Sequence, residues 1–491
     1  MLYVVGMVTF VTAFLDLRED RSKDKSPDVC FRHFTNLARS GISLVVFLSQ
    51  AYWGRRIESP SVRYIPCELD ELQTYKEVAV TAGVGMPVHR TEYHDTRSFL
   101  TLINGKVELV KRVMDADPFH SSHFAWIDFS LFHVIRDTTA AIEYLRMLGR
   151  SRLASPCMVS PGCWPKGQGA DSLATAVNWR FCGGFFLGDR ASLEDFHARY
   201  RKEFPALLAE SGTLTWEVNV WHALELRGWE CEWYKADHND SMLRVPPHLF
   251  QVVASLTTIP SRLGTSCRKT LDSLLPQVEH VYLSVPTAYK RFPGPVELPA
   301  YLTEAPYKDK VTVVRGEDLG PATKYRGALS FIPADAWVFV CDDDQEYAPS
   351  LISKMKSQIH QICVYQNRYD IIRSSTSGGL IHGYVGNLTH ASLLQGLPTF
   401  PLPECASHVD DQWMSIYYFL TGAPINPSGI EEYKDLFQTL ENNHECIGAD
   451  SLFALGTRAV RVRELEAAFG VRFGADGGLA AAAPLPSEAT M

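Results

Sequence analysis

The sequence WVFVCDDDQEY, residues 337 to 347, decides the fold of the second half of this chain. Its first five residues, Trp337 to Cys341, are all apolar, which is typical of a strand buried on both faces of a parallel sheet. Asp342, Asp343 and Asp344 follow at once. Three unpaired carboxylates repel one another and cannot stay in an apolar core. At the carboxyl end of such a strand, where α/β folds bind ligands, they indicate a divalent cation such as Mg²⁺ or Mn²⁺ with phosphate oxygens as its other ligands. A solvated acidic turn is the alternative interpretation.

Composition indicates a globular protein of more than one domain. The chain has 491 residues, of which 46% are hydrophobic and 21% charged. That length is too great for one ordinary hydrophobic core and predicts two or three domains. The formal net charge is -9, and no run of basic residues occurs. Composition therefore gives no support for a nucleic-acid partner, since phosphate backbones are bound by clustered lysine and arginine.

Cysteine usage and the N-terminal stretch bear on the compartment. The 11 cysteines include no CxxC pair, so we expect reduced thiols in a reducing compartment, with structural zinc as the much less favoured alternative. The N-terminal sequence MLYVVGMVTFVTAFLDL lacks a basic start and is too short to span a bilayer. It predicts a buried first strand rather than a signal peptide. With no other long apolar run, the sequence predicts a cytoplasmic protein without a transmembrane segment.

Strand and helix patterns alternate along both halves, which predicts two tandem Rossmann-like α/β domains, each with a mostly parallel sheet. The sequence RVPPH, residues 244 to 248, is the best linker because its two prolines exclude a helix and a central strand. We therefore predict domains at residues 1–245 and 246–469. Residues 470–491, rich in glycine and alanine, are expected to form a disordered tail.

The same series of residue types occurs in both halves. Each half has a threonine near the end of its first strand, then a lysine, a strand-end acid, a later acid and a histidine. In the first half these are Thr12, Lys111, Asp128, Glu217 and His238; in the second they are Thr257, Lys324, the acid triplet, Asp410 with Asp411, and His444. The lysine precedes the strand-end acid by almost the same interval in both halves. We interpret this as a repeat of roles on a duplicated fold.

Several of these residues have a possible chemical role in the second half. Lys324 could reach a diphosphate as a point charge, or be a surface lysine at a helix start. Asp410 and Asp411 open an apolar helix, where one could deprotonate an acceptor hydroxyl or both could simply favour the helix N-terminus. His444 is a candidate metal ligand or phosphate contact, although a lone histidine is more often neither.

The first half has a weaker version of the same set. Asp128, in WIDF, is a single carboxylate where the second half has three, so substrate phosphates would have to supply more of the metal ligands. Glu217 is a candidate acid on a helix among aromatic residues. The case for His238 is the same as that for His444.

Four segments of the second half resemble a GT-A-type glycosyltransferase related to family 2: VVASLTTIPSRL, GEDLGPATKY, VFVCDDDQ and VDDQWMS. The resemblance covers most of residues 250–460. It implies a nucleotide-sugar donor such as a UDP-sugar, and inversion at the anomeric carbon with Asp411 or Asp410 as the base. It implies a Mn²⁺ or Mg²⁺ ion at the DxD motif, with Asp342, Asp344 and His444 as its ligands. It implies donor contacts from Thr257, Thr258, Arg262, Lys324, Asp342 and Asp343.

Segments of the first half, MVTFVTAFLDLR, FAWIDFSLF and FCGGFFLGD, resemble the HtrL/YibB-type family, which shares the GT-A fold. This resemblance implies donor contacts from Thr12, Phe14, Lys111 and Asp128, a metal held by Asp128 and His238, and Glu217 as a catalytic acid. The tandem arrangement is loosely similar to multi-domain enzymes of large algal viruses that build glycans in the cytoplasm.

Together these features predict a bifunctional, metal-dependent hexosyl- or pentosyltransferase acting on a glycan or glycoprotein. One alternative is that the first domain is a non-catalytic module that binds glycan or nucleotide. Another is a metal-dependent phosphohydrolase, which the acid triplet alone would also suit. A nucleotide-sugar pyrophosphorylase is disfavoured, because TAFLDLR and SLTTIPSRL lack the glycines of a phosphate loop after the first strand.

Overall fold

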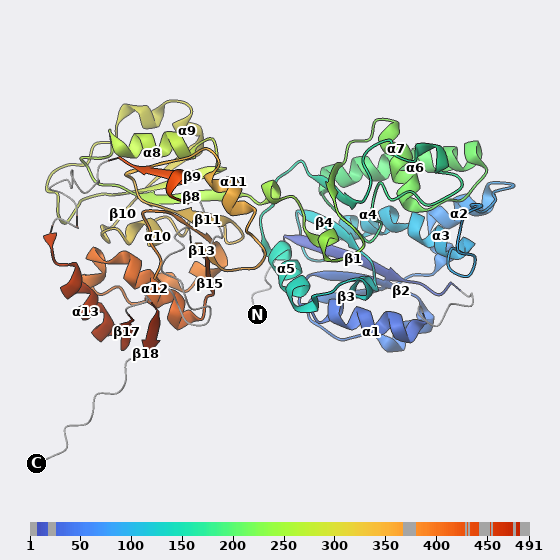
Figure 1. Cartoon of the computed structure of the whole chain (residues 1–491), viewed down its shortest axis with the longest axis horizontal. Helices are drawn as coiled ribbons and strands as arrows, with labels where there is room; N and C mark the ends of the chain where they lie inside the picture. The colour runs from blue at the N-terminus through green and yellow to red at the C-terminus, as the bar shows by residue number, and fades with distance from the viewer. Residues whose placement is uncertain are drawn as a thin grey trace, which may run out of the picture. The chain divides into compact units, whose positions relative to one another are not determined.

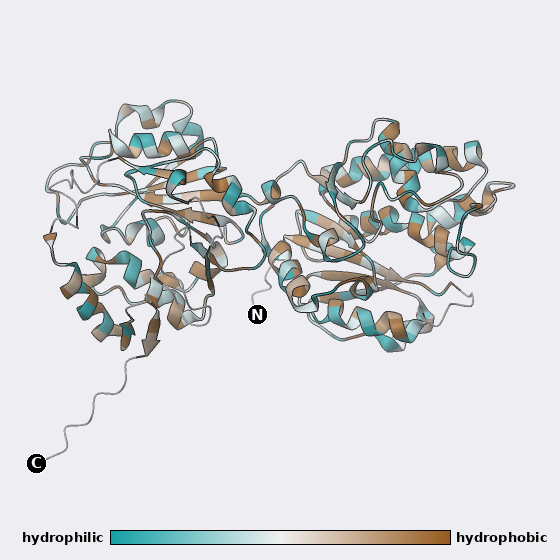
Figure 2. Ribbon diagram, viewed as in Figure 1, coloured by the Kyte–Doolittle hydropathy of each residue, from teal (hydrophilic) through white to brown (hydrophobic). Residues whose placement is uncertain are grey.

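The computed structural model describes residues 7–17, 26–366, 380–427, 430, 433–440, 452, 455–474 and 478–481. The chain divides into two compact units, Met1–Leu249 and Phe250–Met491, called here the first and second domains. Each contains one seven-stranded sheet with helices on both faces (Figure 1). The strands are largely hydrophobic, whereas the helices carry hydrophilic residues as well (Figure 2).

The first sheet has the strand order β3-β2-β1-β4-β6-β5-β7. Strand β6 runs antiparallel to both of its neighbours, and every other neighbouring pair is parallel. The strands are β1 (Val8–Phe14), β2 (Leu44–Leu48), β3 (Val62–Pro66), β4 (His123–Ile127), β5 (Met158–Gly162), β6 (Phe185–Asp189) and β7 (Glu232–Lys235).

Helices lie on both sides of this sheet, a pair on one side and the rest on the other (Figure 1). The first pair is α1 (Pro27–Ala38) and α5 (Thr138–Arg150). The other five are α2 (Gln73–Val80), α3 (Arg97–Asn104), α4 (Lys106–Ala116), α6 (Arg190–Ser211) and α7 (Glu217–Leu226).

The second sheet repeats this topology, with the strand order β10-β9-β8-β11-β14-β13-β15. Strand β14, at the place of β6, is again antiparallel to both neighbours, and the other pairs are parallel. The predicted fold class, two tandem Rossmann-like α/β domains with mostly parallel sheets, is confirmed. The strands are β8 (Val252–Thr257), β9 (His280–Pro286), β10 (Val311–Gly316), β11 (Trp337–Val340), β13 (Val364–Gln366), β14 (Asn387–His390) and β15 (Ile425–Pro427).

Helices cover both faces of the second sheet as well (Figure 1). One face carries α8 (Ser266–Leu274), α9 (Tyr307–Lys310) and α11 (Leu351–Lys356), and the other α10 (Thr323–Arg326), α12 (Asp410–Thr421) and α13 (Arg458–Phe469). Two small antiparallel pairs complete the domain: β12 (Gln345–Tyr347) with β16 (Phe437–Thr439), and β17 (Val471–Phe473) with β18 (Leu479–Ala481).

The pair β17–β18 corrects the expectation of a tail beginning at residue 470. Val471 and Leu479 are each only 2% exposed and join the apolar cluster that contains α12 and α13. Residues 471–473 and 479–481 of this stretch, which is rich in glycine and alanine, therefore form a strand pair, because two buried side chains attach them to the core. The remainder of the predicted tail, residues 482–491, lies outside the described residues.

Every side chain of β1, β4 and β11 is buried, as the unbroken apolar runs predict for central strands of a parallel sheet. In each sheet the second of two central parallel strands, β4 or β11, is followed within two residues by an acid. The carboxyl ends of these strands thus place acids at one edge of each sheet. None of the helices among the described residues combines the length and the apolar run that crossing a membrane requires.

Candidate functional site

The acid triplet of the second domain separates into one partly exposed and two buried carboxylates. The Asp342 side chain is 32% exposed, and its Oδ1 accepts a hydrogen bond from Lys324 Nζ at 2.5 Å. The Asp343 and Asp344 side chains are buried and both contact Arg262, whose Nη1 lies 2.9 Å from Asp343 Oδ1 and 3.0 Å from Asp344 Oδ2. The carboxylates of Asp343 and Asp344 can be buried because the guanidinium of Arg262 balances their charge.

Lys324 connects the strand-end acid to the start of α12. Its Nζ lies 2.7 Å from Asp410 Oδ2, in addition to its bond with Asp342, and 2% of its side chain is exposed. Its carbonyl accepts a 2.6 Å hydrogen bond from Ser255 Oγ, which fixes α10 against β8. Burial opposes the lysine charge, but the carboxylates of Asp342 and Asp410 raise its pKa well above the usual value. Lys324 is therefore positively charged and already paired with two carboxylates.

Asp411, the next residue of α12, is placed differently from Asp410. Its Oδ1 accepts the Gly383 N–H at 2.8 Å, and its side chain is only partly buried. Loss of hydration raises the pKa of Asp411 to about 7, with the Asp410 carboxylate as the second cause. A carboxyl group with this pKa is suited to accept a proton near neutral pH.

The threonines after β8 have different contacts. Thr258 Oγ1 donates to Asp343 Oδ2 at 2.5 Å, whereas Thr257 Oγ1 donates to the Ser284 carbonyl at 2.8 Å, away from the acids. Burial raises the pKa of Asp343 to about 6 even though Arg262 and Thr258 favour its charged form. Thr258 and Arg262 thus belong to the acid cluster, while Thr257 joins β8 to β9.

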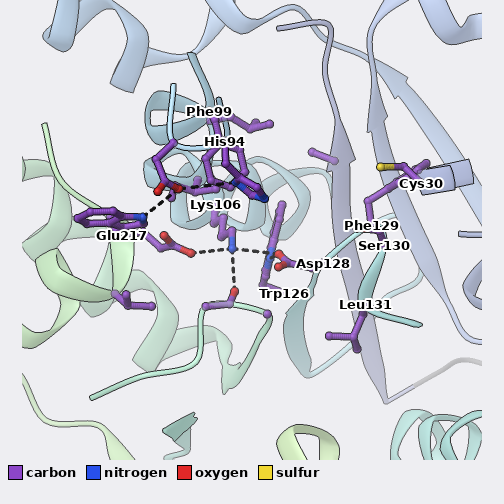
Figure 3. A pocket seen from close by; sticks show the side chains of 18 of the residues that line it. Cys30, His94, Phe99, Lys106, Trp126, Asp128, Phe129, Ser130, Leu131 and Glu217 are labelled. Carbon is purple, nitrogen blue, oxygen red and sulfur yellow. Dashed lines mark hydrogen bonds and ion pairs between the residues drawn. The ribbon is translucent and has the colours of Figure 1, made fainter. Parts of the chain in front are cut away.

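In the first domain Lys106 has the position that Lys324 has in the second. Its Nζ lies 3.0 Å from Asp128 Oδ1, 2.8 Å from Glu217 Oε1 and 2.8 Å from the Gly183 carbonyl oxygen (Figure 3). Its side chain is 4% exposed. Burial opposes the charge, but Asp128 and Glu217 raise the pKa of Lys106 above its usual value.

Asp128 lies at the wall of a cavity of about 330 Å³. Its side chain is 39% exposed, and its Oδ1 also accepts a 2.7 Å hydrogen bond from Trp126 Nε1. Four of the residues predicted for the first site line this cavity: Phe14, Asp128, Glu217 and His238. Aromatic side chains form much of the remaining wall, among them Tyr93, Phe99, Trp126, Phe129, Trp179 and Trp216.

Two residues predicted for the first site lie elsewhere. Lys111 is on α4 but forms an ion pair with Asp115, and it does not line the cavity. The lysine beside the strand-end acid is therefore Lys106, not Lys111. Thr12 is fully buried within β1 and does not line the cavity either.

A glycine comes close to the lysine–acid group in both domains. A Cβ added to Gly183 would lie 2.1 Å from Glu217 Oε1, and one added to Gly383 would lie 2.3 Å from Lys324 Nζ. Gly183 precedes β6 and Gly383 precedes β14, the antiparallel strands at matching places in the two sheets. Each domain thus places a lysine, a strand-end acid, the first residue of a helix and a glycine in one arrangement.

A divalent metal, which the resemblance implies, fits the chemistry of the second site. Asp342 and Asp344 offer hard oxygen donors, and Mg²⁺ is commonly bound by one or two carboxylates together with substrate phosphates. Burial, and after it the charge of Asp342, raise the pKa of Asp344, so a cation there would relieve an unfavourable charge. Within the described residues, however, no three carboxylates bring their ligand oxygens within 4.8 Å of one another. His444 lies outside the described residues.

Lys106, Gly183 and Gly383 belong to the two sites but were not predicted from the sequence, and the structure shows why. Gly105 ends α3 and Lys106 begins α4, so the break in the helical pattern at this glycine marks the start of the functional helix. A Cβ on Gly105 would lie 2.9 Å from Leu72 Cδ1. No local signal distinguishes Gly183 or Gly383, since their role depends on side chains distant in sequence.

No protein-family model matches the chain, and no curated protein matches it. Solved structures are similar over about half of it. One is a glycosyltransferase involved in glycosylation of the major capsid of PBCV-1, 12% identical, covering 47% of this chain and 81% of that chain with a TM-score of 0.23. The galactosyltransferase LgtC, solved with donor and acceptor sugar analogs, is 10% identical over 47% of this chain and 73% of that chain, with a TM-score of 0.25.

A third similar structure is a putative glucose-1-phosphate thymidylyltransferase from Bacillus anthracis, solved with a sucrose. It is 10% identical over 46% of this chain and 98% of that chain, with a TM-score of 0.26. At such identities and TM-scores these likenesses carry no weight for activity, for which the residues of the two sites are the basis.

Proposed function

We propose that each half of the chain is a glycosyltransferase domain that takes a nucleoside-diphosphate sugar and transfers the sugar to a hydroxyl group of a glycan or glycoprotein. One observation carries the proposal. A buried lysine joins a strand-end acid to the first acid of a helix, at the same edge of two sheets that share one strand order. This edge is where open α/β sheets bind ligands. The family resemblance supplies the reaction class, and cytoplasmic glycan synthesis is the proposed setting.

In the second domain, Asp342 and Asp344 are the residues that would hold Mn²⁺ or Mg²⁺. The ion, when bound, would neutralise charge that develops on the departing diphosphate. Arg262 holds Asp344, and Lys324 holds Asp342, by the ion pairs described above. Each of these two carboxylates therefore has a fixed direction before donor binds, which reduces the entropy lost on binding.

Asp411 is the proposed base. Lys324 holds Asp410, whereas Asp411 has one oxygen on the Gly383 N–H and is partly exposed. The remaining oxygen would accept the proton of the acceptor hydroxyl as that oxygen attacks the anomeric carbon. A single displacement of this kind inverts the configuration at that carbon.

In the first domain the proposed donor-facing carboxylate is Asp128, with Glu217 held behind it by Lys106. One observation favours a second candidate function for this domain, a module that binds nucleotide or glycan without turnover. Glu217 has a side chain only 6% exposed, so Asp128 is the more accessible acid of this group. Aromatic walls of the kind seen in this cavity suit sugar stacking as well as catalysis.

The test uses the full chain and two matched variants, Asp128→Asn and Asp344→Asn. A panel of UDP- and GDP-sugars with Mn²⁺ is scored for release of nucleoside diphosphate and for sugar added to acceptor glycans. We expect wild-type turnover with at least one donor and loss of one transfer in each variant. Loss of both transfers in either variant would indicate one composite site. Turnover of simple phosphate esters but of no sugar nucleotide would support the phosphohydrolase instead.

Retention of both transfers in Asp128→Asn would favour the binding-module interpretation of the first domain. In that case the variant should still weaken retention of a nucleotide or glycan by the full chain, measured by calorimetry. Glu346→Gln, which changes an exposed acid two residues after Asp344, is the control for the second site and should keep both transfers.

A further inference from the structure

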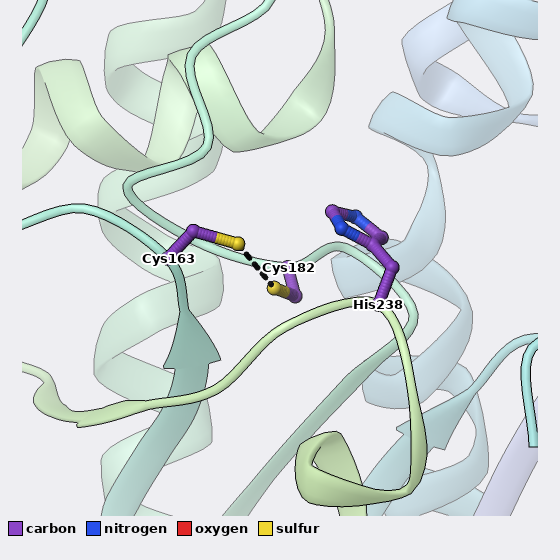
Figure 4. Close-up of side chains that lie close together, drawn as sticks. All are labelled: Cys163, Cys182 and His238. Carbon is purple, nitrogen blue, oxygen red and sulfur yellow. Dashed lines mark hydrogen bonds between the residues drawn. The ribbon is translucent and has the colours of Figure 1, made fainter.

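Three potential metal ligands from different parts of the first domain lie together (Figure 4), and one of them, His238, also lines the cavity. Cys163 follows the last residue of β5, Cys182 precedes β6 by three residues, and His238 follows β7 by three. One ligand atom from each residue lies within 4.8 Å of the other two, and this is the one such group of three within the described residues. Both cysteines are free thiols.

The separation of the two sulfurs matches shared coordination better than a disulfide. Cys163 Sγ and Cys182 Sγ are 3.7 Å apart. Two sulfurs bound to one zinc ion at about 2.3 Å, with the tetrahedral angle between them, lie roughly 3.8 Å apart. A disulfide would require about 2.05 Å. The sulfurs thus already have the spacing of two ligands of a tetrahedral ion.

Backbone hydrogen bonds hold the ligand-bearing segments in place. The Cys163 N–H donates to the Trp179 carbonyl at 2.9 Å, and the Cys182 N–H donates to the Pro161 carbonyl at 2.7 Å. The segment before His238 is attached by the Ala236 N–H, which donates to the Gly162 carbonyl at 2.8 Å. An ion would therefore find its ligands largely preorganised.

A fourth donor is close to the same point. Asp237 Oδ1 lies 3.7 Å from Cys163 Sγ and 3.6 Å from His238 Nδ1. The Asp237 side chain is 74% exposed, and its Oδ1 accepts the His238 N–H at 2.7 Å, a bond that coordination of this carboxylate would share or replace. Two thiolates, an imidazole and a carboxylate form a donor set that suits zinc and differs from the oxygen-only set of Asp342 and Asp344.

We propose that Cys163, Cys182 and His238 bind a zinc ion, with Asp237 completing the tetrahedron. This site is separate from the cation site of sugar transfer. The family resemblance implies that His238 and Asp128 hold one metal ion, whereas here His238 would share its ion with two cysteine sulfurs. Burial raises the pKa of both thiols, so binding would release protons from them at neutral pH.

The zinc would act on the cavity through the residue that follows Cys182. Cys182 is followed by Gly183, whose carbonyl accepts the Lys106 ammonium. Coordination of Cys182 would fix the residue before Gly183 and so restrict the movement of the carbonyl that helps to hold Lys106. The ion would also join the segments next to β5, β6 and β7, so it would stabilise this side of the sheet.

Cobalt(II) substitution in the full chain tests the proposal. The protein is stripped by a chelator under reducing conditions and titrated with Co²⁺. We expect one equivalent to give a thiolate-to-cobalt charge-transfer band and the visible bands of tetrahedral cobalt, both abolished by excess Zn²⁺. The carboxylates of the second domain cannot produce the charge-transfer band, because they contain no sulfur.

Cys163→Ser should reduce the band by half or more, since one of two thiolate ligands is lost, while the protein remains folded by circular dichroism because Cys163 is only partly buried. His238→Ala should weaken cobalt binding and alter the visible bands. Cys231→Ser, at a partly buried cysteine outside the cluster, is the matched control and should leave the spectrum unchanged. Absence of the band in folded wild-type protein, a band of undiminished intensity in Cys163→Ser, or a Cys163–Cys182 disulfide that persists under the reducing conditions would overturn the proposal.

Discussion

Lys324 Nζ lies 2.7 Å from Asp410 Oδ2, and Lys106 Nζ lies 2.8 Å from Glu217 Oε1 at the matching place of the first domain. In both pairs the acid is the first residue of its helix. Both lysines are buried and each contacts a second carboxylate, so their charge is balanced before any ligand arrives. The structure thus suits these lysines to positioning two acids better than to meeting a diphosphate directly.

Replacing Lys106 by methionine should destabilise the first domain. The change leaves Glu217 buried without its cation, and loss of one member of a buried ion pair costs about 3–5 kcal/mol. Because Asp128 remains partly hydrated, we expect the loss in the free energy of unfolding, measured with urea, to be about 3 kcal/mol. Tryptophan fluorescence is a suitable probe, since eight of the ten tryptophans precede residue 250. Lys111→Met, at an exposed ion pair on the same helix, should cost less than about 1 kcal/mol. Equal losses would contradict the assignment.

Adding one carbon to Gly383 should disturb the second site. The new Cβ of Gly383→Ala would lie 2.3 Å from Lys324 Nζ and 3.0 Å from Asp411 Oδ1, so the lysine must move off its acids. Overpacking of this kind costs about 1–3 kcal/mol, and we expect a corresponding fall of about 5- to 150-fold in kcat/KM of the second transfer. Gly316→Ala, where a Cβ would meet no atom within 4 Å, is the control. Wild-type kinetics in Gly383→Ala would show that Lys324 has no positioning role.

Asp344→Ala should abolish metal-dependent release of nucleoside diphosphate by the second domain. The carboxylate is one of two proposed ion ligands, and Mg²⁺ sites with few protein ligands depend on each of them. Chelation of wild-type protein should give the same loss, and added Mn²⁺ should reverse it only in wild type. Donor turnover that survives both the substitution and the chelator would refute metal assistance at this site.

Acidification should slow the second transfer. The proposed base Asp411 must be ionised, and burial raises its pKa to about 7; its charged neighbours are Asp410 on α12, Lys324 on α10 and Asp342 after β11. We therefore expect kcat/KM to fall roughly tenfold per pH unit below this value and to level off above it. Asp411→Asn should lose turnover while retaining donor binding. A rate that is flat through this range in wild type would exclude Asp411 as the base.

Truncating Leu479 to alanine should weaken the second domain although it lies beyond the last long helix. Its side chain is 2% exposed, and comparable substitutions cost about 2–5 kcal/mol. Ala480→Ser, at an exposed neighbour, should be nearly neutral. The midpoint of thermal unfolding is measured for both variants and for wild type. If Leu479→Ala lowers the midpoint no more than Ala480→Ser does, the packing of β18 against the core is contradicted.

How far the fold could be predicted depended on the burial of each strand. Central strands such as β1 and β11 are covered on both faces, which requires unbroken apolar runs that are visible in the sequence. Strand β5, MVSPG, falls in a stretch rich in proline and glycine, and β7, EWYK, has exposed charged ends. Neither has a pattern that distinguishes it from a loop, so only the tertiary structure reveals these two strands.

The candidate site shows a similar division. The acid triplet and the acids of α12 could be found from the sequence. They lie directly beside apolar runs, where a carboxylate must have a partner such as a cation or a hydrogen-bond donor. The choice of Lys111 failed because most of residues 69–115 appear helical, which conceals the break at Gly105. Metal ligation by His444 stays a prediction, as do the catalytic roles of Glu217 and Asp411. Nothing in the sequence distinguishes Cys163 and Cys182 from the other cysteines, since their proximity depends on the pairing of β5 with β6 and β7.

The reversed direction of β6 has a consequence for how the first site can change by mutation. Because this strand runs opposite to its neighbours, the chain entering it lies at the edge where the other strands leave, and there it presents the main-chain carbonyl of Gly183 to Lys106. A side-chain contact is lost by any unsuitable substitution, but a carbonyl oxygen belongs to every amino acid. This contact can be obstructed by a larger residue, yet it cannot be deleted by any replacement. Which residues can replace Gly183 is therefore limited by the space beside Glu217, and not by the chemical type of the new side chain.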